Sequence, residues 1–315
     1  MANDLVPVGV DNFVRAESDR MFDFVLHDTG GTNQWLVNRT PTPLDHQPII
    51  RQNRDTLYSA TIADVSAGAR ITVPDTGGRY ASVMVINQDH YVPHILHDAG
   101  VHELSQDDIG SPFAMVGVRI LVDPADPADV AEVNALQDRF TFEAGSARAF
   151  VHTSYDPTSF ASTREHLLAL SRGLRDFRGA FGMPDEVDPV RHLLGAAAAW
   201  GGFPEREAMY LNVDPGLPVG RYELTARDVP VDAFWSVTVY NAEGFMEPNP
   251  QGIVSVNSVT AEPGADGSIT VRFGDGDEPN TIPTPEHWNY MVRLYLPRAE
   301  AISREWTFPT IRSAR

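Results

Sequence analysis

The 315-residue chain contains no cysteine and no lysine. Without cysteine there can be no disulfide, thiol nucleophile, cysteine-ligated iron–sulfur cluster or cysteine zinc site. Without lysine there can be no Schiff-base lysine, no pyridoxal-phosphate anchor and no phosphate-loop lysine. Composition alone therefore excludes several large classes of enzyme.

Basic charge is also scarce, because 24 arginines stand against 43 acidic residues and the formal net charge is −19. An acidic surface repels phosphate backbones and acidic membranes, so we expect neither a nucleic-acid nor a membrane partner. No stretch approaches the roughly 20 apolar residues that cross a bilayer, and the N-terminus lacks the pattern of a secretory signal. We therefore expect a cytoplasmic protein.

The first part of the chain reads as one helix followed by short strands. Residues 10–28 have the spacing of an amphipathic helix, which Gly30-Gly31 should end. Turn signals then separate the predicted strands. These strands are 56–64, 69–73, 79–87 and 111–122. Both faces of 79–87 are apolar, so this strand is expected to be central in its sheet.

The middle of the chain is predicted to be helical and the last third to return to strands. One helix is expected near 127–138, a second from Ser162 with a capping box to Glu165, and a third after Asp188-Pro189. The later strands are 208–213, 220–227, 233–240, 253–260, 267–273 and 289–296. Many short strands between turns favour sandwiches or jelly rolls over a parallel sheet.

We therefore predict a mainly β protein with helical segments, in which a helical connector joins two β-sandwich or jelly-roll-like domains. The expected divisions are an N-terminal helix (1–30), a first β-domain (31–125), the connector (126–205) and a second β-domain (206–315).

Several longer motifs occur along the chain. They are NRDTLYS (53–59), NQDHYVP (87–93), DPVRH (188–192), FWSVTVYN (234–241), WNY (288–290) and RLYLP (293–297). In this order they resemble the bacterial proteins that pair domain of unknown function 1254 with domain of unknown function 1214. The resemblance covers residues 35–312 and implies two β-sandwich or jelly-roll-like domains. It implies no reaction.

Histidines are concentrated at one place, His90, His94 and His97, with Tyr91 between the first two. Imidazoles suit both transition metals and general acid–base chemistry. Pro93 is expected to open a short helix or turn that sets His94 and His97 one turn apart. Three interpretations stay open: a transition-metal ion held by the three histidines, a metal-free site using His90, Tyr91 and His94, and a structural loop.

The second candidate is Arg54-Asp55 with Tyr58, directly before and within an apolar strand. A guanidinium group can bind a carboxylate with two hydrogen bonds, and Asp55 can serve as a base or hold Arg54 in place. The alternative is a buried ion pair that organises the start of the strand. A charged pair at such a position is costly unless it is well satisfied.

Further positions are candidates for substrate binding because aromatic and basic side chains often line ligand cavities. They are Arg191, His192, Tyr210, Trp235, Tyr240 and Trp288. The alternative for most of them is a place in the core, and for Arg191-His192 a tie between the connector and a β-domain.

The leading functional hypothesis is an enzyme acting on a small organic ligand, anionic or carbonyl-containing, with or without a metal ion. It requires the histidine loop and Arg54-Asp55 to share one cavity. The alternatives are a non-catalytic jelly-roll protein that binds a small molecule or carbohydrate, and a structural or assembly protein. The sequence has no GxSxG or GxGxxG motif. It names no cofactor and leaves homo-oligomerisation open.

Overall fold

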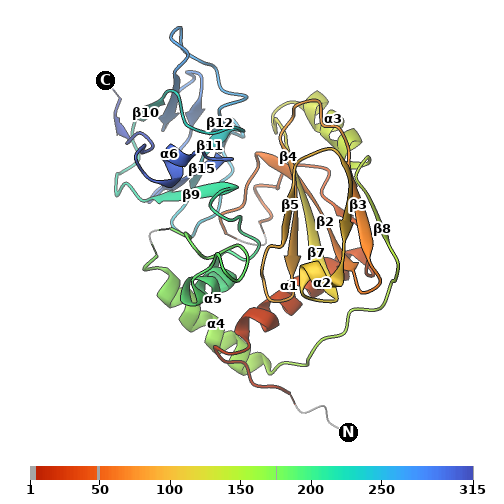
Figure 1. Cartoon of the computed structure of the whole chain (residues 1–315). Helices are drawn as coiled ribbons and strands as arrows, with labels where there is room; N and C mark the ends of the chain where they lie inside the picture. Colours follow the sequence, from red (N-terminus) through yellow and green to blue (C-terminus); the bar gives the residue numbers. More distant parts are fainter. Residues whose placement is uncertain (1–4, 48–49, 175, 315) are drawn as a thin grey trace. The chain divides into compact units, whose positions relative to one another are not determined.

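The computed structural model describes residues 5–47, 50–174 and 176–314. Figure 1 labels its elements. The chain divides into two compact units. Unit 1 comprises residues 1–39, 57–121 and 126–204, and unit 2 comprises residues 40–56, 122–125 and 205–315. Four sheets and several helices make up the two units, which confirms the prediction of a mainly β protein with helical segments.

Unit 1 is built on a five-stranded sheet with the order β1-β2-β7-β4-β5 and a three-stranded sheet with the order β6-β3-β8. The strands are β1 (Leu36–Val37), β2 (Thr56–Asp64), β3 (Ala69–Val73), β4 (Ala81–Asn87), β5 (His94–Leu96), β6 (Gly100–Leu104), β7 (Phe113–Leu121) and β8 (Thr141–Ala144). Strand β4 is buried along its whole length between β7 and β5, so the prediction that it is central is confirmed.

Unit 1 also holds α1 (Phe13–Thr29), α2 (Gln106–Ile109), α3 (Pro127–Gln137), α4 (Pro157–Ser171) and α5 (Pro189–Ala198). Helix α1 packs against α4 and α5, with Phe13, Leu167 and Leu194 in their shared core. It ends, as predicted, at Gly30, whose φ of 77° is left-handed. None of the helices in the described ranges is long and apolar enough to span a membrane.

Asp-Pro pairs start α3, α4 and α5, because the aspartate accepts a backbone N–H of the first turn and proline suits the first helical position. The start predicted for α4 at Ser162 is wrong. Asp156 caps the helix by accepting the N–H of Ser159, so the proposed Ser162–Glu165 capping box lies inside the helix.

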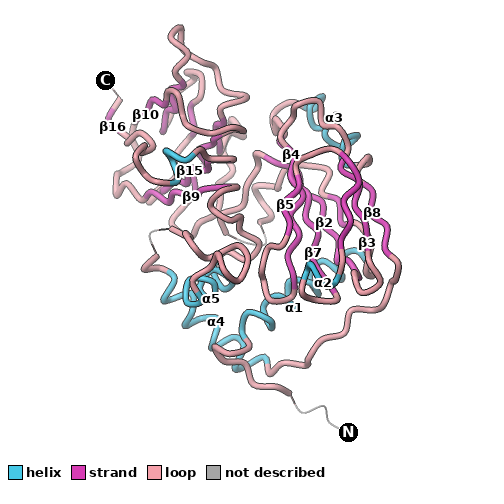
Figure 2. Tube along the Cα trace, viewed as in Figure 1, coloured by secondary structure: helices cyan, strands magenta, loops and turns pink. Residues whose placement is uncertain are grey.

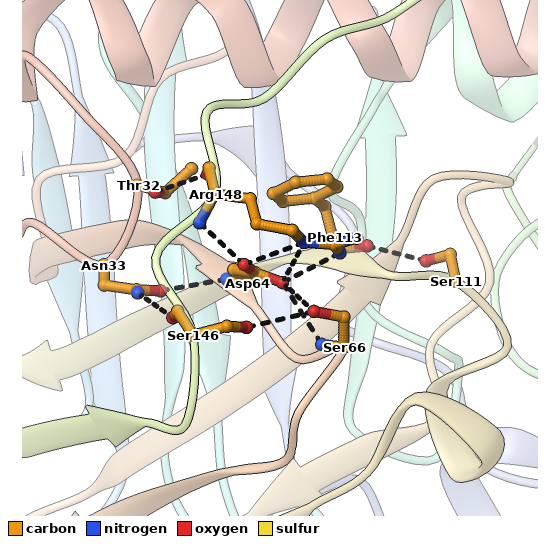
Figure 3. A network of polar contacts seen from close by, with 8 residues as sticks. All are labelled: Thr32, Asn33, Asp64, Ser66, Ser111, Phe113, Ser146 and Arg148. Carbon is orange, nitrogen blue, oxygen red and sulfur yellow. Dashed lines mark hydrogen bonds and ion pairs between the residues drawn. The ribbon is translucent and has the colours of Figure 1, made fainter.

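A long irregular segment connects β8 to α4, as the loop colouring of Figure 2 shows. One buried carboxylate holds its first part (Figure 3). Asp64 accepts the backbone N–H of Arg148 at 2.8 Å, the guanidinium of the same residue at 3.0 Å and the hydroxyl of Ser66 at 2.6 Å. Asn33 donates to Ser146 O in the same network. Burial alone would raise the pKa of Asp64, but the bonds from Arg148 and Ser66 outweigh it and lower the pKa.

We expect Asp64→Asn to reduce the free energy of unfolding by about 1–2 kcal/mol at pH 7, because the buried carboxylate loses charge-assisted hydrogen bonds. The loss is moderate because about half of the Arg148 side chain is exposed, so that solvent screens the ion pair. Because the pKa of Asp64 is lower in the folded protein than in the unfolded chain, the ionised carboxylate stabilises the fold at pH values above the unfolded pKa of about 3.9. This stabilisation is lost as the pH falls through the folded-state pKa. Denaturant unfolding should therefore show a constant difference from pH 8 to about pH 5 that shrinks below about pH 4. Glu143→Gln, which breaks the exposed pair with Arg70, is the control and should stay close to wild type.

Unit 2 is a β-sandwich of two four-stranded sheets, β12-β11-β15-β9 and β14-β13-β10-β16. The elements are β9 (Ala208–Val213), β10 (Tyr222–Ala226), β11 (Trp235–Tyr240), β12 (Ser255–Asn257), β13 (Ile269–Phe273), β14 (Thr281–Ile282), β15 (Asn289–Tyr295), α6 (Ala299–Ile302) and β16 (Arg312–Ser313). Side chains of both sheets share one apolar core, which includes Val237, Val271 and Val292.

Candidate functional site

One face of the β12-β11-β15-β9 sheet is polar and nevertheless buried. Successive residues of a strand point to opposite faces. In β11, Trp235, Val237 and Val239 enter the sandwich core, which places Ser236, Thr238 and Tyr240 on the other face. All three are 0% exposed. Such a face needs hydrogen-bond partners, and residues 40–47 and 50–56 of the same unit supply them. We call these two stretches together the covering segment.

Arg293 of β15 joins the polar face to the covering segment. Its guanidinium donates to Thr238 Oγ1 at 2.9 Å and to the Tyr240 hydroxyl at 2.7 Å. It also donates to the backbone oxygen of Arg51 at 3.0 Å. The Tyr240 hydroxyl in turn donates to Gln52 O at 2.8 Å. A single cation, only 3% exposed, thus ties two strands of the sheet to the segment that covers them.

Asp55 is the fully buried acid of this network. Burial raises its pKa, although Arg293 and, to a lesser degree, Ser236, Asn257 and Ser255 act in the opposite direction. Among the described residues, none meets either Asp55 carboxyl oxygen with hydrogen-bond geometry. Arg293, the first residue of the RLYLP motif, is therefore the cation that favours the charged form of Asp55.

Arg54 belongs to the covering segment. Its guanidinium donates to Thr42 O at 3.0 Å within the covering segment, and burial lowers its pKa. Asn53 extends the network, because it donates to the Tyr295 hydroxyl at 2.8 Å and accepts the N–H of Asp55 at 2.9 Å. The motif that begins at Asn53 thus anchors the covering segment to β15.

In unit 1, His90 is held at the end of the β4 hairpin. Asn87 accepts the N–H groups of Asp89 and Tyr91, both at 2.9 Å, and this tight turn gives His90 a φ of 63°. The Gly201 N–H donates to His90 Nε2 at 2.9 Å, so the remaining ring proton is on Nδ1. Burial and, secondarily, His192 lower the pKa of His90 well below its usual value. The folded protein therefore holds a neutral imidazole here.

His192 stacks between Tyr91 and His90, with ring centres 4.7 Å and 5.4 Å away. Its two nitrogens face carbonyl oxygens, Ala180 O at 2.9 Å and Asp89 O at 3.0 Å. These contacts connect α5 to the loop after β4. The neighbouring Arg191 donates to the Asp176 carboxylate at 2.7 Å. Their geometry is that of a tie between the connector helices and the first sheet, the second of the two interpretations.

The histidine loop contains a strand where a short helix or turn was expected, and that prediction is wrong. His94 lies in β5 opposite Val85, and His97 follows the strand with Nδ1 2.9 Å from Ala81 O. Among the described residues, no group of three or more His, Asp or Glu side chains is placed to hold a metal ion. The structure therefore offers no support for a metal ion bound by His90, His94 and His97.

Tyr58 lies in β2 of unit 1, with its ring 5.7 Å from the guanidinium of Arg119. Arg54 and Asp55 belong to unit 2, whereas Tyr58, His90 and His94 belong to unit 1. One cavity shared by these residues stays a prediction.

The apolar side of unit 2 contains a cavity of about 510 Å³. It lies against β9 and β15 and beneath residues 306–311, the chain between α6 and β16. Six apolar side chains make up much of its wall: Leu211, Val213, Leu217, Val292, Trp306 and Phe308. Arg304, Thr307 and Thr310 add polar groups, and Tyr290 adds a phenol.

The remaining aromatic candidates of unit 2 lie in the sandwich core, near this cavity, or in the strands that carry the polar face. Trp235 meets Phe308 edge to face, with ring centres 5.5 Å apart, and Trp288 stacks on Phe273 at 5.2 Å in the sandwich core. Tyr210 lies in β9 opposite Arg293. Sequence reasoning missed the cavity itself. Its only signal was the alternation of apolar residues in β9 and β15 together with the aromatic pair Trp306 and Phe308.

A second cavity, of about 440 Å³, lies along the other sheet of unit 2 and is lined mainly by charged side chains. Arg221 pairs with Glu278 and Arg312 with Glu223, so its charges neutralise each other. The apolar cavity is the stronger candidate, because it combines an apolar wall with a few polar groups.

Comparison with known proteins places the chain in a class. Residues 217–299 match the family described as a protein of unknown function, DUF1214, and residues 32–96 match the one described as a protein of unknown function, DUF1254. The chain is thus a tandem DUF1254/DUF1214 protein, which confirms the resemblance read from its motifs. No curated protein matches its sequence.

Two solved structures share the fold. The VPA0106 protein from Vibrio parahaemolyticus is 18% identical, with a TM-score of 0.76, and the match covers 97% of this chain and 98% of that one. An uncharacterised protein from Burkholderia cenocepacia is 13% identical, with a TM-score of 0.55, and the match covers 96% and 87% of the two chains. At these identities the likeness establishes the fold and no activity.

Proposed function

We propose that unit 2 binds a small, largely apolar organic molecule in the cavity beneath residues 306–311. The observation that carries the proposal is the cavity of about 510 Å³ with its apolar wall. Binding sites for small molecules commonly measure about 300–1,000 Å³ and combine an apolar lining with a few polar groups. Tyr290, Arg304 and two threonines are such groups here.

Two features favour a small molecule over a protein partner. The cavity lies between the sheet and residues 306–311 of the same chain, so part of it is already covered. Its wall comes from regular strands, whose rigidity suits a preformed site. Carbohydrates are less favoured, because the wall offers few polar side chains for hydroxyl groups. A catalytic role at Asp55 or His90 stays a hypothesis.

Fluorescence titration with the neutral apolar dye N-phenyl-1-naphthylamine tests the proposal. Leu211→Trp and Val213→Trp, which replace half-buried wall residues, should fill the cavity and weaken dye binding roughly tenfold or more. Asn212→Trp is the matched control, because Asn212 lies between them on β9 and is exposed. It should keep wild-type affinity.

Equal dye affinity in all three variants, with folding verified by circular dichroism, would contradict the proposal. So would a wild-type protein that binds no dye and none of the naphthalene probes described below.

A further inference from the structure

One polar group on the wall of the apolar cavity, the Tyr290 hydroxyl, makes no hydrogen bond to any of the described residues. Tyr290 lines the cavity and is only 2% exposed. Within the described ranges, its hydroxyl has no charged or hydrogen-bonding partner, and burial is the sole cause that raises its pKa, to about 12. A hydroxyl on a cavity wall that bonds no protein atom is available to a molecule in the cavity, and such polar groups fix the orientation of a bound ligand.

The Tyr290 ring is held in place by its neighbours. It lies 5.2 Å from Phe273 and 6.1 Å from Trp288, both in the sandwich core, and its backbone is part of the β15 ladder opposite Val213. A phenol fixed in this way is a preorganised hydrogen-bond donor, because little side-chain freedom remains to be lost on binding. At neutral pH it keeps its proton and therefore donates.

We propose that the cavity selects an apolar molecule that carries one acceptor oxygen, and that the Tyr290 hydroxyl donates to this oxygen. The inference rests on the proposed function and adds the chemistry of the ligand. A carbonyl oxygen and a carboxylate oxygen share this chemistry. A carboxylate would in addition meet the positive charge of Arg304 on the cavity wall.

Three probes of similar size separate these chemistries by isothermal titration calorimetry: 2-acetylnaphthalene, 2-naphthoate and 2-ethylnaphthalene, which lacks the oxygen. We expect at least one of the two oxygen-bearing probes to bind about three- to tenfold more tightly than 2-ethylnaphthalene. Tyr290→Phe should remove this preference and leave 2-ethylnaphthalene unaffected. Preference for naphthoate would identify an anionic ligand, and preference for acetylnaphthalene a neutral one.

Tyr222→Phe is the matched control. Tyr222 belongs to the same unit, but its hydroxyl donates to Pro218 O at 3.1 Å and does not line this cavity. It should keep the oxygen preference of the wild type. Tyr290→Phe should fold as well as wild type, because the removed hydroxyl has no protein partner.

The outcomes separate the two proposals. If all three probes bind equally well, or if the preference survives Tyr290→Phe, the inference about Tyr290 is wrong while the apolar site stands. If none of the probes and no dye binds, the proposed function fails as well.

Discussion

Arg293→Met is expected to destabilise unit 2 by roughly 3–5 kcal/mol, the usual effect of removing one partner of a buried charge network. Methionine has similar length and no charge, so packing is largely kept. What is lost is the donor to Thr238, Tyr240 and the Arg51 carbonyl oxygen. Asp55 also loses its nearby positive charge.

Hydrogen exchange measured by mass spectrometry reports this change locally. Exchange in the peptides of β11 and β15 should accelerate strongly, because these strands carry the polar face. The matched control is Arg298→Met. Arg298 pairs with Asp232 at the surface of the same unit and is half exposed, so this variant should exchange like wild type.

A double-mutant cycle separates the charge from the hydrogen bonds. Asp55→Asn should be costly in the wild-type background and clearly less costly in the Arg293→Met background, where the Asp55 carboxylate has already lost its cation. Equal costs in both backgrounds would show that Asp55 and Arg293 do not interact. Wild-type exchange in Arg293→Met would contradict the central role of the guanidinium.

The same network shows where sequence reasoning stops. The alternation in residues 233–240 and 289–296 was enough to predict β11 and β15. Arg54 and Asp55 are neighbours in the chain, but the Arg54 guanidinium donates to Thr42 O, and Arg293 is the cation that acts on the Asp55 carboxylate. The cation beside Asp55 is more than two hundred positions away, and only tertiary structure brings it there.

The two units are also not continuous in sequence, because each is made of separate stretches of the chain. Residues 40–56 lie between β1 and the body of β2 in sequence, both strands of unit 1, yet Gln52 and Asn53 contact β11 and β15. Local patterns can give a segment its conformation, but not the sheet it covers. Unit 2 resumes at Glu205, where helical spacing in the sequence gives way to strand alternation.

For the histidine loop, the sequence predicted the cluster of residues but not its geometry. Pro93 suggested a helix or turn, whereas pairing with β4 makes His94 part of a strand. The importance of His90 lies in its burial, which no local pattern reports. The ring packs on Trp200 at 5.1 Å and accepts from Gly201.

This burial makes His90 a source of acid instability. Because its pKa is lowered in the folded protein, the unfolded chain binds a proton near pH 6.5 that the folded chain refuses. The unfolded state is therefore favoured increasingly as the pH falls below about 6.5, by roughly 1–2 kcal/mol for each pH unit while the ring stays neutral. Between pH 8 and pH 5 the wild type should lose about 2 kcal/mol through this group.

His90→Asn tests this, because asparagine tolerates the left-handed backbone at φ 63° and does not titrate. The variant is expected to be less stable than wild type at pH 8, where it loses ring packing against Trp200 and Phe181. Its stability should then fall less between pH 8 and pH 5, so the two curves of unfolding free energy converge. The charged or titratable groups near His90 are His192 and the Arg15–Asp89 pair, and both proteins contain them. Their contributions to the pH dependence of stability therefore cancel when the two curves are subtracted. Parallel curves over this range would mean that the His90 imidazole accepts a proton within the fold, against the neutral ring that its contact with Gly201 requires.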